Sequence, residues 1–214
     1  MSIPRNLNIW GSCRIKKGQA WTGETIFFQQ EDAAAAVFLT ALYKALQVNY
    51  PKWYKMDRLS QLGILAAELL FRDAGLPEGS QPVETAIVLA NSHSSLDTDT
   101  RFTAQLEEIP SPAVFVYTLP NIVIGEISIR YGIKGEQAFY LMEKPDMEFL
   151  HQYVQALFAE GQTKYCIVGW LDLFREEYEA VLFLVGSQQG SAAGKVFNKE
   201  NLYQYLYHEQ GAVS

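Results

Sequence analysis

Apolar residues recur along this chain with two different periods, and the period of two marks the strands. Apolar and polar side chains alternate over residues 7–15, which predicts a strand, or a strand with a turn at Gly11. Residues 85–90 form a continuous apolar run, short enough for a strand buried on both faces of a parallel sheet. Further apolar runs predict strands over residues 137–143, 165–170 and 181–186.

The second period is that of an amphipathic helix. Residues 33–47 are rich in alanine and place larger apolar side chains at helical spacing. The clearest helix follows, because Asp57 can cap its start and Gly75, shortly before Pro77, can end it. Other helices are expected over residues 101–108, 121–131 and 146–160, and a last helix is expected to dock within the tail 195–214.

The order of these elements predicts the fold class. Strands that alternate with helices indicate an α/β domain with a mostly parallel sheet and helices on both faces. The short acidic link 175–179 indicates that the last two strands are antiparallel neighbours. No internal repeat and no linker interrupts residues 1–214, so a single domain is expected.

Composition and charge exclude several classes of partner. The chain has 214 residues, 49% hydrophobic and 19% charged, which suits one domain with a sizeable core. A net charge of −7 repels nucleic acid, and an acidic carrier protein would need a local basic patch. The apolar runs fall short of the roughly 20 residues that span a bilayer, so no membrane partner is expected. The start of the chain lacks a signal-peptide core, so a cytoplasmic location is expected.

Candidate chemistry is sparse, and we expect no cofactor and no metal. Cys13 and Cys166 lack CxxC spacing and are expected to be small buried hydrophobes. Ser94 and Ser95 adjoin His93 without a GxSxG elbow, which favours loop polarity over a hydrolase site. Three further patterns favour structural roles: isolated histidines at His93, His151 and His208, a flexible connection over 186–194, and a solvated turn rather than a cation site at Asp172, Glu176, Glu177 and Glu179.

Three stretches together resemble the N-terminal half of the β-ketoacyl-acyl-carrier-protein synthases, which have a thiolase-like fold. Residues 56–76 are similar to the family's helix before its second strand, and residues 112–121, with the turn 132–135, to the segment that enters the active-site strand. Residues 161–169 are similar to the strand after the nucleophile helix. The order and spacing of these matches cover about residues 56–172.

The resemblance implies a more specific sheet and a way of associating. It implies five strands in the spatial order 3-2-1-4-5, with residues 137–143 as the third strand, at the sheet edge. In the family this edge pairs with its copy across a dimer, so a homodimer or a heterodimer with a synthase-like chain is expected, and an acyl carrier protein is a further candidate partner. The candidate dimer edge consists of Gln137, Ala138, Phe139, Tyr140, Leu141, Met142 and Glu143.

The resemblance also implies a lost catalytic function. Counted from Gly135 to Gly161 without gaps, the position of the family's catalytic cysteine falls on Lys144. A lysine cannot accept and pass on an acyl group as that thiolate does, and no histidine matches the family's second-half motifs.

The helix 146–160 should have one face in water, since Glu148, His151, Gln152 and Gln155 lie opposite its apolar half.

These expectations favour a non-catalytic accessory or scaffold protein of a fatty-acid-like or polyketide-like pathway, which binds a synthase, a carrier protein or itself. Two kinds of enzyme remain open as alternatives: an acyltransferase or condensing enzyme completed by a partner chain, and a hydrolase that uses a different residue. A binding domain that keeps only the fold is a further alternative.

Overall fold

A computed structural model describes residues 7–75, 82–106, 111–187 and 195–207 of the chain. Its strands are β1 (Leu7–Lys16), β2 (Gln19–Thr22), β3 (Thr25–Gln29), β4 (Thr85–Asn91), β5 (Gln137–Leu141), β6 (Tyr165–Phe174), β7 (Glu177–Ser187) and β8 (Lys195–Val196). Its α-helices are α1 (Ala35–Ala45), α2 (Arg58–Ala74), α3 (Leu96–Ala104), α4 (Pro112–Val116), α5 (Ile122–Tyr131), α6 (Met147–Ala159) and α7 (Lys199–Tyr207). Two 3₁₀ helices, η1 (Pro51–Lys55) and η2 (Pro82–Glu84), complete the elements.

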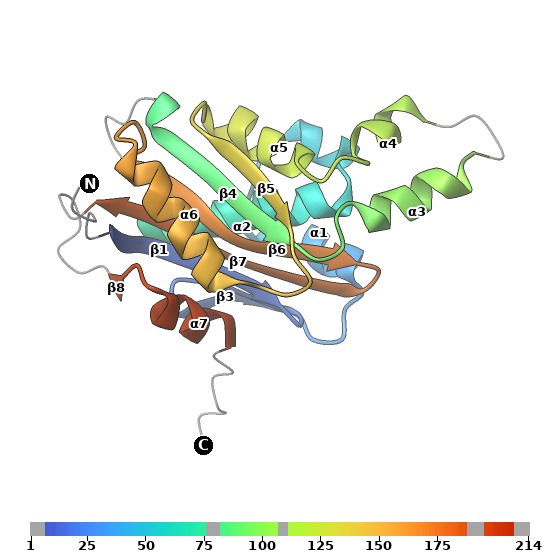
Figure 1. Cartoon of the computed structure of the whole chain (residues 1–214). Helices are drawn as coiled ribbons and strands as arrows, with labels where there is room; N and C mark the ends of the chain where they lie inside the picture. Colours follow the sequence, from blue (N-terminus) through green and yellow to red (C-terminus); the bar gives the residue numbers. More distant parts are fainter. Residues whose placement is uncertain (1–6, 76–81, 107–110, 188–194, 208–214) are drawn as a thin grey trace, which may run out of the picture.

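All strands belong to one sheet of eight strands, in the order β3-β2-β1-β7-β6-β4-β5, with β8 paired to β1 (Figure 1). The expected five-stranded, mostly parallel sheet is therefore wrong, because five of the seven pairings among the described strands are antiparallel. The expected order 3-2-1-4-5 is also wrong, because β1 lies outside β7 and not between β4 and β6. Residues 85–90 pair directly with residues 165–170 in parallel, and this leaves no place for β1 between them. The expected hairpin of the last two strands is present, and β1 pairs antiparallel with the far side of β7.

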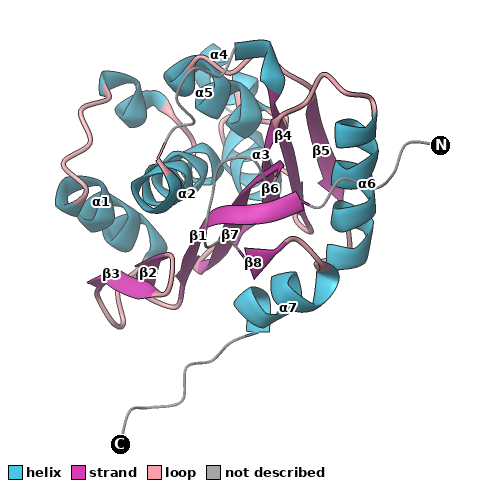
Figure 2. Cartoon of the chain, turned by 90° about the vertical axis from the view of Figure 1, so that its left-hand side faces the viewer, coloured by secondary structure: helices cyan, strands magenta, loops and turns pink. Residues whose placement is uncertain are grey.

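Helices cover both faces of the sheet, as the alternation of elements predicts (Figure 2). On one face α1, α2 and α5 enclose a large apolar core, and on the other face α6 and α7 enclose a smaller one. Asp57 caps α2 by accepting a hydrogen bond from Ser60 N at 3.0 Å, and Gly75 ends α2 with φ +70°. Both ends of this helix were predicted from the sequence.

Two elements differ from expectation, and the tail helix agrees with it. Helix α3 spans residues 96–104 and not 101–108, because Asp97 and Asp99 place negative charge in its first turn. Strands β2 and β3 form a hairpin where a loop was expected, and the turn into β2 uses Lys17 and Gly18, both at positive φ. The tail helix α7 is present, while residues 208–214 lie outside the described residues.

The last elements return to the sheet and cover part of it. Strand β8 pairs with Asn8 and Ile9 of β1, and α7 follows beside α6 on the same face. Helix α6 buries Leu150 and Val154 and leaves Glu148 and Gln152 exposed, as expected for a helix with one face in water. No helix in the described part of the chain is both long and apolar enough to cross a membrane.

Candidate functional site

Three neighbouring parallel strands, β5, β4 and β6, end at the same edge of the sheet. Ligand sites of open α/β sheets usually lie outside these carboxyl ends, so the loops here are the first place to look for chemistry. Residues 142–146 follow β5, residues 92–95 follow β4, and Asp172 lies near the end of β6. Met142 N donates to Asn91 O at 2.9 Å, which brings the first two loops together.

The loop before α6 contains Lys144, the residue at the expected nucleophile position. Its side chain is exposed. Asp146 caps α6 by accepting a hydrogen bond from Phe149 N at 2.9 Å. Pro145, a residue type suited to a first helical turn, lies before this cap and outside the helix. The loop is therefore an ordinary capped helix start with a solvated lysine.

Asp172 accepts several hydrogen bonds from the loop after β4. Its Oδ1 accepts from Ser92 N at 3.2 Å and from His93 N at 3.1 Å. Its Oδ2 accepts from Ser92 Oγ at 2.8 Å and lies 2.7 Å from His93 Nδ1. The His93 ring stacks on Phe174 with 5.1 Å between ring centroids. The expectation that His93 is isolated is therefore wrong, and spacing gave no sign of its partner because Asp172 lies 79 residues away in the chain.

This cluster has the residue types of a serine hydrolase but not the geometry. Ser92 Oγ lies 2.9 Å from His93 Nδ1, the same nitrogen that faces Asp172, whereas a catalytic triad needs the two partners on different ring nitrogens. The backbone N–H groups of Ser92 and His93 both donate to Asp172, and that of Ser94 donates to Asn91 Oδ1 at 3.0 Å. None of these three N–H groups is available to an oxyanion, so the cluster fixes the loop to β6.

Ser95, Glu176 and Glu179 also have structural partners. Ser95 Oγ donates to Thr118 O at 2.6 Å and does not approach His93. Glu176 accepts from Ala35 N at 2.7 Å, and Glu179 pairs with Lys16 at 2.6 Å. No group of three possible metal ligands occurs among the described residues. Most of the glycine-rich stretch 186–194 lies outside the described residues, as does His208.

Both cysteines lie in strands and are buried, as predicted from their apolar surroundings. Burial raises the pKa of the Cys13 thiol to about 12, and it also raises the pKa of Cys166. Since the thiolate is the reactive form, native protein at pH 8 is expected to react with a maleimide at least a hundred times more slowly than unfolded protein. Mass spectrometry of labelled protein over time measures this, and rapid native labelling would contradict the burial.

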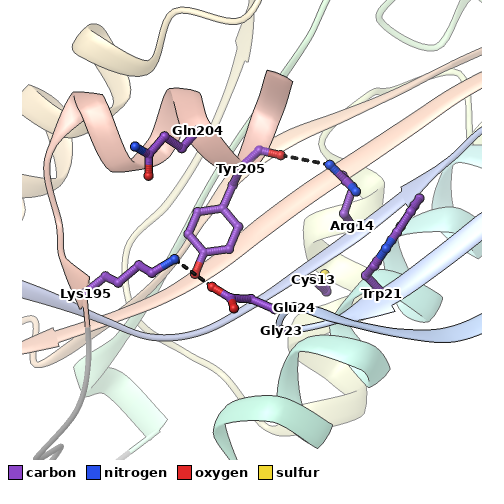
Figure 3. Close-up of a pocket in the computed structure, with 8 residues that line it drawn as sticks. All are labelled: Cys13, Arg14, Trp21, Gly23, Glu24, Lys195, Gln204 and Tyr205. Atoms are coloured by element: carbon purple, nitrogen blue, oxygen red, sulfur yellow. Dashed lines mark hydrogen bonds and ion pairs between the residues drawn. The ribbon is translucent and has the colours of Figure 1, made fainter. Parts of the chain in front are cut away.

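A small cavity lies between the β1–β2 hairpin and α7 and has a volume of about 150 Å³ (Figure 3). The Arg14 guanidinium lies 4.0 Å from the centroid of the Trp21 ring, and Lys195 pairs with Glu24 at 2.7 Å. The charged groups of the wall thus interact with the protein itself, and the Glu24–Lys195 pair connects β8 to the turn between β2 and β3.

Strand β5 ends the sheet, and its outer side pairs with no described strand. Residues 137–142 contain neither a charged residue nor proline. Leu141 is 60% exposed, and Tyr140 forms an aromatic cluster with Phe149 and Tyr153 of α6. On the opposite face of the sheet, a groove of about 340 Å³ separates β5 from α5; Pro120, Asn121, Ile124, Gln137 and Phe139 line it. An open, uncharged strand with apolar groups on both faces is suited to pairing with another chain.

Comparison with known proteins identifies solved structures that have a similar fold. No protein-family profile matches the sequence, and no curated protein matches it either. Solved structures do match. The ishigamide ketosynthase/chain length factor has a TM-score of 0.66 at 17% identity, and the match covers 87% of this chain and 63% of that chain. A ketosynthase (ApeO) in complex with its chain length factor (ApeC) from Xenorhabdus doucetiae has a TM-score of 0.57 at 15% identity, covering 86% and 80%.

A β-ketoacyl synthase from Burkholderia phymatum STM815 matches with a TM-score of 0.57 at 12% identity, over 86% of this chain and 60% of that chain. The chain thus spans less than two thirds of the first and third of these solved chains. The resemblance to the β-ketoacyl synthases is confirmed at the level of fold: the chain has the thiolase-like fold of ketosynthases and chain length factors.

Proposed function

We propose that this chain is a non-catalytic, ketosynthase-like subunit of a fatty-acid-type or polyketide-type pathway. It acts by binding a synthase-like chain, or a second copy of itself, through β5. The observation that carries the proposal is the open, uncharged β5 edge in a fold whose loop before α6 holds Lys144 and no thiol.

The residues in the loops at the carboxyl ends of β5, β4 and β6 support a non-catalytic role. A ketosynthase-type reaction needs a nucleophile that accepts an acyl group, and both thiols of this chain are buried away from the loop before α6. The Ser92, His93 and Asp172 cluster does not replace that nucleophile, since its amides and its Nδ1 are already engaged. This argument also disfavours the alternative of a hydrolase that uses a different residue.

The comparisons support the binding part of the proposal. The solved complex of ApeO with ApeC contains a ketosynthase and a chain length factor. The match covers similar shares of both chains, so the matched chain is not much longer than this one. A chain of similar size and the same fold therefore occurs in a two-protein complex of that kind, and this supports an intact ketosynthase as the partner.

The catalytic half of the proposal predicts a negative result with a clear control. Purified chain incubated with acyl-carrier and malonyl-carrier substrates is expected to gain no acyl adduct in intact-mass spectra and to form no condensed product. An intact ketosynthase treated in the same way gains an adduct and serves as the positive control. A stable adduct on this chain would contradict the proposal.

The binding half is tested by co-expression with an intact ketosynthase whose gene neighbours that of this chain. A complex of the two chains, with condensing activity that depends on the ketosynthase cysteine alone, is the expected result. Neighbouring genes without any synthase or carrier protein, together with a strictly monomeric chain, would remove the support for this role.

A further inference from the structure

The cavity between the β1–β2 hairpin and α7 lies at the opposite end of the sheet from β5. Arg14 of β1 and Trp21 of β2 are direct cross-strand partners, so their side chains share one face of the sheet. Helix α7 lies over this face and contributes Gln204 and Tyr205 to the wall (Figure 3). The hairpin thus supplies one side of the cavity and the last helix supplies the other.

The size of the cavity limits what it can hold. Its volume is about 150 Å³. A single water needs about 10–15 Å³ by this measure, so there is room for roughly ten water-sized groups. A small organic molecule fits, and a nucleotide or a coenzyme is too large. The rings of Trp21 and Tyr205 give the wall apolar surfaces, and a ligand site combines such surfaces with a few polar groups that fix the orientation of the ligand.

The charge of the wall favours an anion. Arg14 and Lys195 are positive and Glu24 is negative, which leaves one excess positive charge in a chain whose net charge is −7. Glu24 and Lys195 pair with each other at 2.7 Å and so offset each other. Burial lowers the pKa of Arg14, although the charge of Glu179 opposes this, because the buried guanidinium loses hydration. A negative charge beside Arg14 would compensate for that loss.

The Trp21 side chain supplies a second donor. Trp21 is 7% exposed, and its Nε1 has no hydrogen-bond partner within the described part of the chain. A buried indole N–H usually has an acceptor, and one without an acceptor is destabilising. The Arg14 guanidinium lies 4.0 Å from the centroid of this ring and donates to Tyr205 O at 3.5 Å. A guanidinium has five N–H donors and can serve several acceptors at once.

We propose that this cavity binds a small monocarboxylate with a flat, apolar body. One carboxylate oxygen accepts from Arg14, and the other accepts from Trp21 Nε1 when the flexible Arg14 side chain moves off the indole ring. The planar guanidinium suits the two oxygens of a carboxylate, and one excess positive charge suits a monoanion. A phosphate carries more charge and has no apolar body for the Trp21 and Tyr205 rings. The site goes beyond the proposed function and does not depend on β5.

The indole N–H of Trp21 reports binding directly. The chain has four tryptophans, so the NMR spectrum of ¹⁵N-labelled protein contains four indole N–H signals, and the signal lost in Trp21→Phe is that of Trp21. Titration with benzoate is expected to move this signal downfield and to leave the other three in place. Benzamide has the same shape without the charge, and it is expected to bind at least about tenfold more weakly.

Three variants test the two donors, with affinities measured by calorimetry. Arg14→Lys keeps the charge and loses the planar fork, so it should weaken benzoate binding about tenfold. Trp21→Phe keeps an aromatic ring and loses the N–H, so it should weaken binding roughly fivefold. Lys199→Gln is the control, because Lys199 belongs to α7, pairs with Glu148 and does not line the cavity. The remaining indole signals show that each variant is folded.

The outcomes decide this site separately from the subunit role. Equal affinities for benzoate and benzamide, or an unchanged benzoate affinity in Arg14→Lys, overturn the proposed carboxylate site. Inorganic phosphate that moves the Trp21 signal where benzoate does not would also overturn it and show that the cavity takes a different anion. None of these results changes the expected association through β5, which co-expression with the ketosynthase tests by itself.

Discussion

Replacing Phe197 with alanine is expected to lower the free energy of unfolding by about 3 to 5 kcal/mol. Phe197 lies between β8 and α7, is 2% exposed, and packs in the core beneath α6 and α7. Its N–H donates to Leu7 O at 2.8 Å, which holds it against β1. The truncation leaves a cavity under α7 that the short, singly paired β8 cannot close, so the loss should be large.

The neighbouring residue provides a matched control. Val196, the last residue of β8, is 53% exposed, and Val196→Ala should change stability by no more than about 0.5 kcal/mol. Urea denaturation followed by circular dichroism measures both variants. Equal stability of Phe197→Ala and Val196→Ala would show that β8 and α7 do not contribute to the folded core.

The packing of β8 and α7 on the core explains how the sheet face beneath α6 is covered. The sequence predicts a water-facing side for α6, and the structure shows it, with α7 covering the area beside α6. Here α7 buries Leu202 and Leu206 on the same face, so part of the cover comes from the chain's own last helix.

Local signals in the sequence were sufficient for several elements. Asp57 and Gly75 predicted both ends of α2, because a cap and a left-handed stop act within a few residues. The buried run 85–90 predicted β4 for the same reason, since its composition admits only a strand covered on both faces. The hairpin of β2 and β3 had a usable signal too, because Gly18 and Gly23 bracket a short run with Trp21, but the run was too short to be recognised as a strand.

The elements that depend on distant partners could not be predicted. The position of β1 follows from the long pairing of β7 with both β6 and β1, and the sequence of β1 does not encode which neighbour it takes. The contact of His93 with Asp172 joins residues far apart in the chain, so spacing gave no signal for it. The edge position of β5 was expected from the resemblance and agrees with the sheet order, while its pairing with another chain stays a prediction.

Replacing Phe139 with proline is expected to convert the β5-paired dimer into a folded monomer. Ile87 N donates to Glu136 O and Met142 N donates to Asn91 O, so the even-numbered residues bond to β4 and the N–H of Phe139 faces away from it. Proline at this position therefore removes a donor to the second copy and leaves the bonds to β4 in place. At the two-fold axis both copies lose this donor. Two bonds of about 1 kcal/mol each disappear, and the proline rings clash across the axis, so the dissociation constant should rise more than tenfold.

Phe139→Ala is the matched control, because it removes the same ring and keeps the N–H. Light scattering should report a dimer for Phe139→Ala and a monomer for Phe139→Pro at tens of micromolar, with similar thermal unfolding temperatures at low protein concentration. Tyr140→Pro removes an N–H that faces β4 and should destabilise the fold itself. If Phe139→Pro remains a dimer with unchanged affinity, the chain associates through a surface other than β5, because antiparallel pairing through this strand uses the outward N–H of Phe139.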